Sequence, residues 1–129
     1  MALGALHDVT GRCACGQVSY CCAVESQAVL CACDLCRRNS GSAFQAWVDG
    51  RRASLILTGE TSQWASSDHA TRHFCTSCGS ALFLFERDEP DVVEIAAGTL
   101  DEPHAVSSSR LSSRYRDWPE WTKTVVAGR

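Results

Sequence analysis

The sequence predicts a small, mainly β domain with few or no long helices, and three observations support this prediction. The 129 residues are enough for one domain with its own hydrophobic core and too few for two. Short apolar runs that alternate with a period of two are separated by turns rich in Gly and Asp. The helical period of 3.6 is scarce along the chain.

Five runs have the alternation of strands, namely residues 18–24, 44–48, 54–57, 81–85 and 92–97. In the first run, a period of two places Cys22 on one face and Cys21 on the other, so Cys22 is expected in the core. In the second run, Phe44 and Trp47 could line a pocket, but a core position is favoured for Trp47 because aromatic residues in strands usually pack inside.

No repeat, low-complexity tract or flexible linker divides the chain, so residues 1–129 are predicted to form a single domain. From about residue 103 the sequence has no clean period and is rich in Ser and Arg, which predicts an ordered but irregular tail. Trp118 and Trp121 flank Pro119 there. Indole rings bury a large area even in loops, so both are expected to hold the tail against the body of the domain.

The charge balance argues against a polyanionic partner. Lys and Arg total 12 and Asp and Glu total 15, and a net charge of −3 gives no attraction for nucleic acid or an anionic membrane. Residues 1–10 lack the features of a signal peptide, and no apolar run approaches the roughly 20 residues of a membrane span. We therefore expect a soluble cytoplasmic protein whose partners are small molecules. The sequence does not indicate an oligomeric state.

Nine cysteines require an explanation by disulfides, metal binding, redox chemistry or burial. The odd number and the lack of an export signal count against a disulfide framework. In a reducing compartment, thiols one or two residues apart more often bind metal than form cystines. The spacing of the cysteines therefore decides between these explanations.

Four cysteines form two short pairs, and each pair is followed by glycine: Cys13 and Cys15 before Gly16, and Cys75 and Cys78 before Gly79. Two thiolates so close can bind one ion only if the backbone turns tightly behind them, and glycine supplies the positive φ of such turns. Four thiolates with no open position predict a closed, structural zinc site. The alternatives are buried free thiols, or a redox pair in the second motif.

Three further cysteines, Cys31, Cys33 and Cys36, lie within six residues and have no evident fourth partner. Zinc sites with an open fourth position are the ones that carry out chemistry, because a substrate can enter the coordination shell. Three thiolates make the metal a poor activator of water but suit it to a soft sulfur ligand. These cysteines are therefore the predicted catalytic zinc site, and the predicted substrate carries a thiol.

Two arginines and a turn-forming polar stretch follow this cluster. Zinc with three thiolates has a formal charge of −1, which Arg37 and Arg38 could offset while binding a carboxylate of the incoming ligand. Together with Ser40 they are the predicted contacts of the thiol substrate. The alternative is that the arginines are solvated surface charges.

The four histidines, His7, His69, His73 and His104, lack paired spacing with any cysteine and are expected to be surface or neighbouring groups, not ligands. No Gly-x-Ser-x-Gly motif of serine hydrolases is present.

Four motifs together resemble one known family. They are Gly-Arg-Cys-x-Cys-Gly-x-Val-x-Tyr at 11–20, Cys-x-Cys-x-x-Cys-Arg-Arg with Gly-Ser-Ala-Phe at 31–44, Phe-Cys-x-x-Cys-Gly-Ser at 74–80 and Ala-Gly-Thr-Leu-Asp at 97–101. Through them, residues 11–103 resemble the glutathione-dependent formaldehyde-activating enzyme (GFA) family, whose domain also occurs in centromere protein V.

This resemblance implies a small β fold of the Mss4-like kind with zinc-stapled sheets. It also implies two zinc ions per chain, a structural one on Cys13, Cys15, Cys75 and Cys78 and a catalytic one on Cys31, Cys33 and Cys36. The implied activity is that of a carbon-sulfur lyase, in which the thiolate of glutathione attacks formaldehyde to give S-hydroxymethylglutathione.

The sequence departs from the family pattern at Ala32, where members often carry His, so an imidazole is missing from that position. The namesake enzymes are also longer. The alternative function is a non-catalytic, zinc-stabilised binding or scaffold module, as the centromere relative suggests. That relative relies on basic or extended segments that this acidic chain lacks.

Overall fold

The computed structural model describes residues 3–128. Its strands are β1 (His7–Arg12), β2 (Ser19–Cys31), β3 (Gln45–Arg51), β4 (Ile56–Thr58), β5 (Thr61–Ser67), β6 (Ala70–Cys75), β7 (Ala81–Glu86), β8 (Val92–Ala96) and β9 (Ser108–Leu111). The helices are α1 (Asp34–Ser40) and α2 (Glu120–Val126), of seven residues each. The prediction of a mainly β fold without long helices is confirmed.

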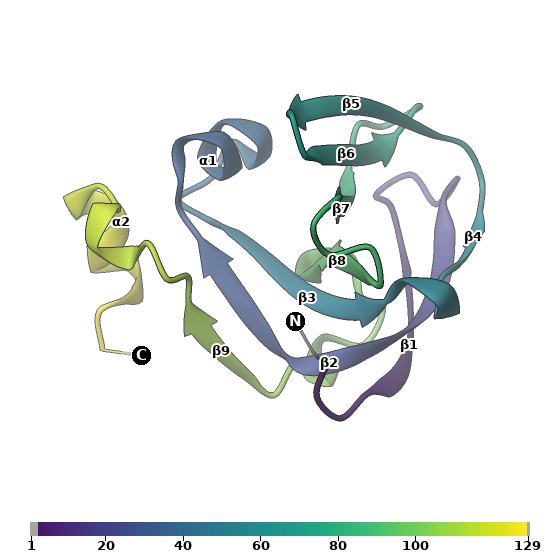
Figure 1. Ribbon diagram of the computed structural model, residues 1–129, viewed down its shortest axis with the longest axis horizontal. Helices are drawn as coiled ribbons and strands as arrows, with labels where there is room; N and C mark the ends of the chain where they lie inside the picture. Colours follow the sequence, from purple (N-terminus) through teal and green to yellow (C-terminus); the bar gives the residue numbers. More distant parts are fainter. Residues whose placement is uncertain (1–2, 129) are drawn as a thin grey trace.

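One curved sheet contains all of these strands, in the order β1-β2-β3-β8-β7-β6-β5, with β4 and β9 both paired to β2 (Figure 1). Every pairing is antiparallel except that of β9 with β2. An irregularity between Val24 and Ala28 divides β2. Its first half pairs with β1 and β4 and its second half with β9, whereas β3 pairs with the second half and with Val24. Strand β2 therefore pairs with four other strands and carries Cys31 at its end.

All five predicted strands are present, but the prediction omitted β1, β5, β6 and β9. The inward alternation of β2 is clear, and Cys22 is 3% exposed, as expected for a core residue. Trp47 is also in the core, at 3% exposure. Strand β5 escaped prediction because most of its side chains are exposed or half-buried, which leaves no apolar alternation to detect.

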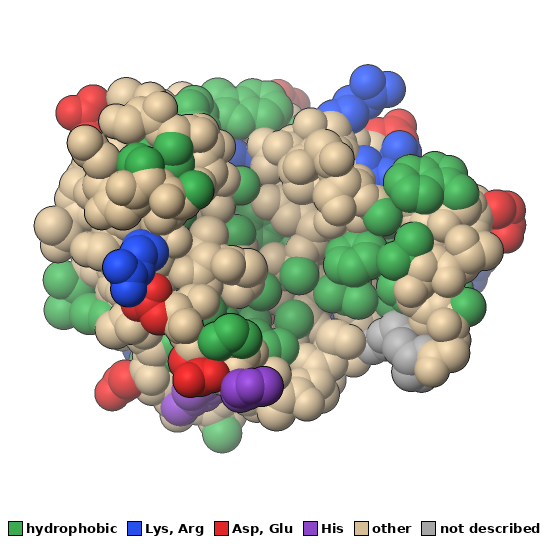
Figure 2. All heavy atoms as spheres, turned by 180° about the vertical axis from the view of Figure 1, so that it is seen from behind, with side chains coloured by type: hydrophobic (Ala, Val, Ile, Leu, Met, Phe, Trp, Pro, Cys, Tyr) green, Lys and Arg blue, Asp and Glu red, His purple; other side chains and the backbone are tan. Residues whose placement is uncertain are grey.

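The main core is formed by fully buried side chains that come mostly from β2, β3, β7 and β8. The largest of them are Phe83, Leu82, Ile95, Val18, Val24, Val48 and Val93. Seen from behind, apolar side chains gather in the middle of the molecule and on the lobe around α2 (Figure 2).

The C-terminal segment is more regular than expected, because it contains β9 and α2 in addition to short 3-10 turns. It packs against the α1 side of the sheet through a second cluster formed by Leu30, Ala32, Trp118 and Val126. Trp118 is 4% exposed and holds the segment in place as expected, whereas Trp121 is 57% exposed and does not. No helix within residues 3–128 has the length and apolar character of a membrane span.

Candidate metal centres

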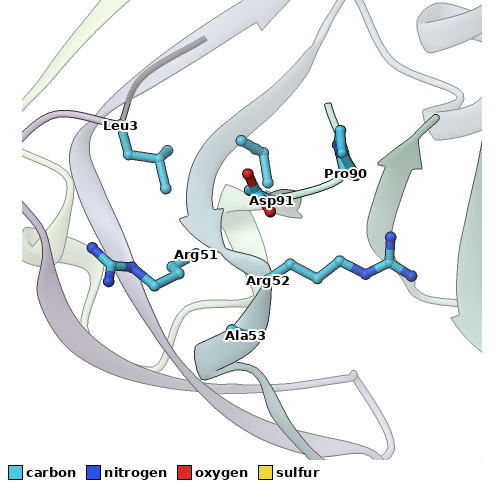
Figure 3. Close-up of a pocket in the computed structure, with 7 residues that line it drawn as sticks. Leu3, Arg51, Arg52, Ala53, Pro90 and Asp91 are labelled. Carbon is cyan, nitrogen blue, oxygen red and sulfur yellow. The ribbon is translucent and has the colours of Figure 1, made fainter. Parts of the chain in front are cut away.

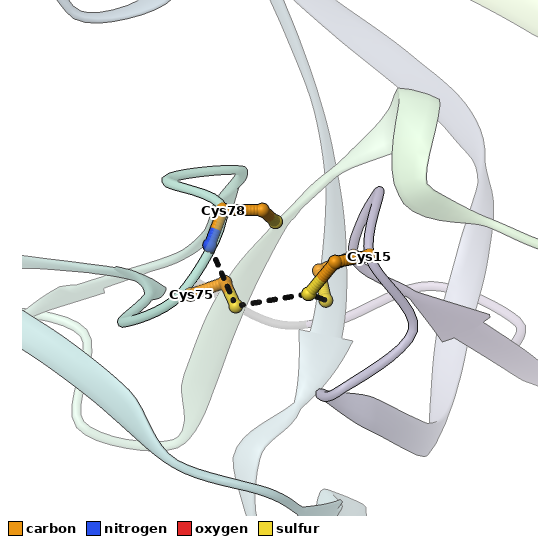
Figure 4. A group of neighbouring side chains, drawn as sticks. Cys15, Cys75 and Cys78 are labelled. Atoms are coloured by element: carbon orange, nitrogen blue, oxygen red, sulfur yellow. Dashed lines mark hydrogen bonds between the residues drawn. The ribbon is translucent and has the colours of Figure 1, made fainter.

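The first cysteine cluster joins two turns that are far apart in the sequence. Cys13 and Cys15 lie between β1 and β2, whereas Cys75 ends β6 and Cys78 lies between β6 and β7. Figure 4 shows the second turn facing the first across the sulfur atoms. The sulfur of Cys15 lies 3.6 Å from that of Cys13 and 3.8 Å from that of Cys75.

Both turns have the backbone geometry that the glycines predicted. Gly16 has φ of 81° and Gly79 has φ of 80°, a region that disfavours residues with a Cβ. The N–H of Gly16 donates to the carbonyl of Cys13, and the N–H of Gly79 donates to that of Cys75. Each pair of thiols is therefore folded back toward one point.

The four sulfurs fit a tetrahedral zinc ion. All lie within 4.8 Å of one another, and zinc-sulfur bonds of about 2.3 Å in a tetrahedron require sulfurs roughly 3.8 Å apart. Backbone N–H groups also donate to two of them, from Val18 to Cys13 at 3.2 Å and from Cys78 to Cys75 at 3.4 Å. The hydroxyl and backbone N–H of Ser80 lower the pKa of Cys78 to about 5, which favours the thiolate that a metal needs.

The second cluster forms where β2 ends and α1 begins. Cys31 is the last residue of β2, Cys33 is the N-cap of α1, and Cys36 is in its first turns. The N–H of Cys36 donates to the sulfur of Cys33 at 3.3 Å, which is the hydrogen bond expected of an N-cap side chain. Gly41, with φ of 66°, ends the helix. The three sulfurs again lie within 4.8 Å of one another.

These three sulfurs form an incomplete coordination shell. Among residues 3–128, no fourth Cys, His, Asp or Glu ligand atom joins them, and no histidine belongs to either cluster. The spacing suits three corners of a tetrahedron around zinc, with the fourth left to a ligand. The structure therefore contains two cysteine clusters that could each hold a metal ion, one closed and one open.

The environment of Cys36 favours its thiolate form. The pKa of Cys36 is lowered to about 5, first by the S–H of Cys31 and then by the guanidinium of Arg72, with the indole N–H of Trp47 acting in the same direction. The pKa of Cys31 is raised in turn, because its proton is shared with Cys36 and because its side chain is buried. Cys36 itself is 3% exposed.

Arg72 is a residue of this centre that the sequence prediction missed. It lies on β6, is 5% exposed, and its Nη2 donates to the sulfur of Cys36 at 3.6 Å. Its Nη1 donates to the side-chain oxygen of Gln45 at 3.2 Å, and that oxygen also accepts from Asn39. The sequence shows an arginine in the segment that leads into Cys75. The spacing of residues 36 and 72 does not predict that they are in contact.

The predicted contacts of the thiol substrate lie on α1. Arg37 donates through Nε to the carbonyl of Ala32 at 3.0 Å and forms an ion pair with Asp34. Ser40 donates to the carbonyl of Cys36 at 2.8 Å. Arg38 is exposed and, with Arg37, lines a hollow of about 390 Å³ whose opposite wall includes Trp121.

Two other hollows differ in their relation to the cysteine clusters. One, of about 580 Å³, lies where Leu3, Arg51, Arg52 and Asp91 meet (Figure 3). None of its lining residues belongs to a cysteine cluster. A more enclosed cavity of about 170 Å³ adjoins the three-cysteine cluster, because Arg72 and Trp47 form part of its wall.

Comparison with known proteins finds a family that matches the part of the chain containing both cysteine clusters. Residues 8–117 match the family described as glutathione-dependent formaldehyde-activating enzyme. A Halomonas elongata protein that is named after the same enzyme is 30% identical over 101 residues, which cover 72% of this chain. The chain spans 64% of the length of that relative.

A crystal structure of a Rhodobacter sphaeroides protein has the same fold. It superposes with a TM-score of 0.63 at 22% identity, covering 80% of this chain and 99% of that one. The family match covers both cysteine clusters and most of the sheet that carries them. The chain therefore belongs to the glutathione-dependent formaldehyde-activating enzyme family.

Proposed function

We propose that this protein is a zinc-dependent carbon-sulfur lyase or thiol-adduct synthase that joins a small thiol to an aldehyde or a similar electrophile. Glutathione and formaldehyde are the proposed substrates, as the family name suggests. The observation that carries the proposal is the cluster of Cys31, Cys33 and Cys36, whose three sulfurs gather without a fourth protein ligand among residues 3–128.

The residues of this cluster have distinct roles in the proposed reaction. Zinc bound by the three sulfurs would supply a Lewis acid that holds a thiol as its thiolate. Arg72, which contacts Cys36, offsets the negative charge that accumulates when another thiolate arrives. The capped start of α1 fixes Cys33 and Cys36 relative to each other, so the open position keeps a constant direction.

The reaction balances without a redox partner. The thiol loses its proton to solvent, and its sulfur lone pair forms a bond to the carbonyl carbon. The electrons of the carbonyl π bond move to oxygen, which takes up a proton to give the S-hydroxymethyl product. Lysis of the adduct is the same sequence in reverse.

Arg37, Arg38 and Ser40 are the proposed contacts of the carboxylates of glutathione. Support comes from the hollow beside α1, which presents the exposed guanidinium of Arg38 within one helical turn of Cys36. A guanidinium binds a carboxylate through parallel hydrogen bonds. The proposed setting is the cytoplasm, with small molecules as partners.

Zinc counting tests the two sites. We expect two zinc ions per chain in the native protein, one in a folded Cys36→Ser variant, and aggregation of Cys78→Ser. The matched control is Cys21→Ser, which changes a thiol outside both clusters and should retain two ions.

Activity is tested by the rate at which ¹³C-formaldehyde exchanges with its glutathione adduct, measured by NMR. The native protein and Cys21→Ser should accelerate the exchange, and Cys36→Ser should not. A scaffold function would be supported instead by X-ray absorption showing four protein ligands at both metals, with no spectral change on addition of glutathione.

A further inference from the structure

Arg72 carries a buried donor that its protein contacts leave unused. Nη1 donates to Gln45 and Nη2 donates to Cys36, but Nε has no hydrogen-bond partner among residues 3–128. A buried donor without a partner costs roughly 1–3 kcal/mol, and most such groups in native proteins are satisfied by a ligand or water. The position of Nε therefore points to an acceptor that belongs to a ligand.

The charge of Arg72 leads to the same conclusion. The side chain is 5% exposed, and the ion pairs found within residues 3–128 do not include it. Buried arginines are normally paired with an anion. The sulfur of Cys36 provides part of that compensation, and an oxygen with negative charge at Nε would add to it.

The free donor lies beside the reacting centre. Nε and Nη2 share one edge of the planar guanidinium, so an acceptor bound at Nε lies next to the sulfur contacted by Nη2. Arg72 and Trp47 also form part of the wall of the 170 Å³ cavity. The indole nitrogen of Trp47 is buried too, but it is directed at the sulfur of Cys36, without a completed hydrogen bond.

The cavity restricts what can reach Nε. Sites for drug-sized ligands have volumes of roughly 300 Å³ or more, so this one admits a molecule of only a few heavy atoms. Its other walls are formed by the aromatic rings of Trp64, Phe74 and Phe83 and by the polar side chains of Asn39 and His73. In a partly enclosed site of this kind, a hydrogen bond from a buried cation to a developing oxyanion has a larger effect than it would have in open water.

We propose that Arg72 is a catalytic residue whose Nε binds the carbonyl oxygen of a small aldehyde lodged in this cavity. This inference rests on the proposed function. As the thiolate sulfur bonds to the carbonyl carbon, the π electrons move to the oxygen held by Nε, and the resulting alkoxide then takes a proton from solvent. The cavity selects aldehydes the size of formaldehyde over bulky ones.

The test compares Arg72→Met and Arg72→Lys with Arg87→Met, which removes an exposed arginine outside the cavity. In the zinc-loaded protein at saturating glutathione, Arg72→Met should lower kcat/KM for formaldehyde by about 100-fold, the usual effect of losing one oxyanion donor. Arg72→Lys should recover part of it, and Arg87→Met should match the native protein.

A second readout separates contact with the aldehyde from an effect on the metal. In cobalt-substituted protein, loss of the Arg72 charge beside Cys36 should change the thiolate-to-cobalt absorption bands and the Kd for glutathione much less than it lowers the rate. If both change as much as the rate does, Arg72 acts through the sulfurs and the inference is wrong. Unchanged kinetics in Arg72→Met would also overturn it while leaving the proposed function intact.

A third readout does not depend on activity. ¹³C-formate, a small anion with carbonyl geometry, should bind the native protein and show exchange broadening that Arg72→Met abolishes and Arg87→Met retains. If the native protein accelerates no addition of thiol to aldehyde, the proposed function fails, and formate binding alone decides whether Nε forms an oxygen site. Absence of formate binding to the native protein would overturn that site.

Discussion

Ser80 and Ala14 link the two turns of the four-cysteine cluster, because the N–H of Ala14 donates to the hydroxyl of Ser80 at 2.9 Å. The same hydroxyl lies 3.2 Å from the sulfur of Cys78 and lowers its pKa. One serine therefore aligns the turns and stabilises a ligand as its thiolate. It is the kind of supporting contact that strengthens metal binding without touching the metal.

Replacing this serine should weaken zinc binding selectively. In Ser80→Ala, Ala14 loses its acceptor and Cys78 loses a donor, so we expect zinc at this site to be bound about 10-fold more weakly. Competition with a chromophoric chelator measures the change. Ser77→Ala is the control, since Ser77 is exposed on the same turn. Equal affinities in the two variants would contradict the role given to Ser80.

The closed site should also contribute most of the metal-dependent stability. Its ligands close a loop from residue 13 to residue 78, and constraining a long loop stabilises the folded state more than bridging a short one. The open site spans only residues 31–36. Thermal melting should therefore show a much larger loss of Tm in Cys75→Ser than in Cys33→Ser. The reverse order would show that the loop argument is wrong.

Glu94 should make stability depend on pH. Burial, followed by the charges of Glu86 and Asp49, raises its pKa to about 8 from an ordinary value of 4.5. The folded state therefore keeps a proton that the unfolded state releases, and the free energy of unfolding should fall as pH rises from about 4.5 to 8.

The Glu94→Gln variant removes this titration, so its free energy of unfolding should fall less than that of the native protein between about pH 6.5 and pH 9. Urea unfolding at both pH values, with zinc present, measures the difference. Glu60→Gln, at an exposed position, should behave like the native protein. Parallel pH profiles for native and Glu94→Gln protein would rule out the effect.

The two tryptophans of the C-terminal segment should differ sharply in their effect on stability. Trp118→Ala leaves a cavity in the second hydrophobic cluster and should cost about 3–5 kcal/mol. Trp121→Ala changes an exposed ring and should stay within roughly 0.5 kcal/mol of the native protein. Chemical denaturation measures both. Similar losses of stability in the two variants would mean that Trp121 is buried as Trp118 is, which contradicts the packing of α2 in this structure.

The cysteine clusters could be predicted from the sequence because their geometry is local. Each pair or triplet lies within a few residues, and the glycines after Cys15 and Cys78 specify the turn that brings the thiols together. The pairing of the two turns was also predictable, since two thiols alone leave a tetrahedral ion incomplete. The longest apolar runs likewise predicted the buried strands.

The parts that escaped prediction depend on contacts between distant residues. Arg72 reaches Cys36 only because β6 curves beside α1, and no local pattern encodes this. Helix α1 has seven residues, too few to show a helical period, and it exists largely because Cys33 and Gly41 cap its ends. Strand β9 is polar, and it is ordered by parallel pairing with β2 rather than by its own alternation.

The parallel pairing of β9 with β2 supports the strand that carries one residue of the three-cysteine cluster. Residues of β9 align with the last part of β2, and the N–H of Ser112 donates to the carbonyl of Leu30, immediately before Cys31. A protein truncated before β9 would leave that stretch of β2 as an unpaired edge. Loss of β9 would therefore loosen the strand that ends in Cys31, so the order of the three-cysteine cluster depends on a segment more than 70 residues further along the chain.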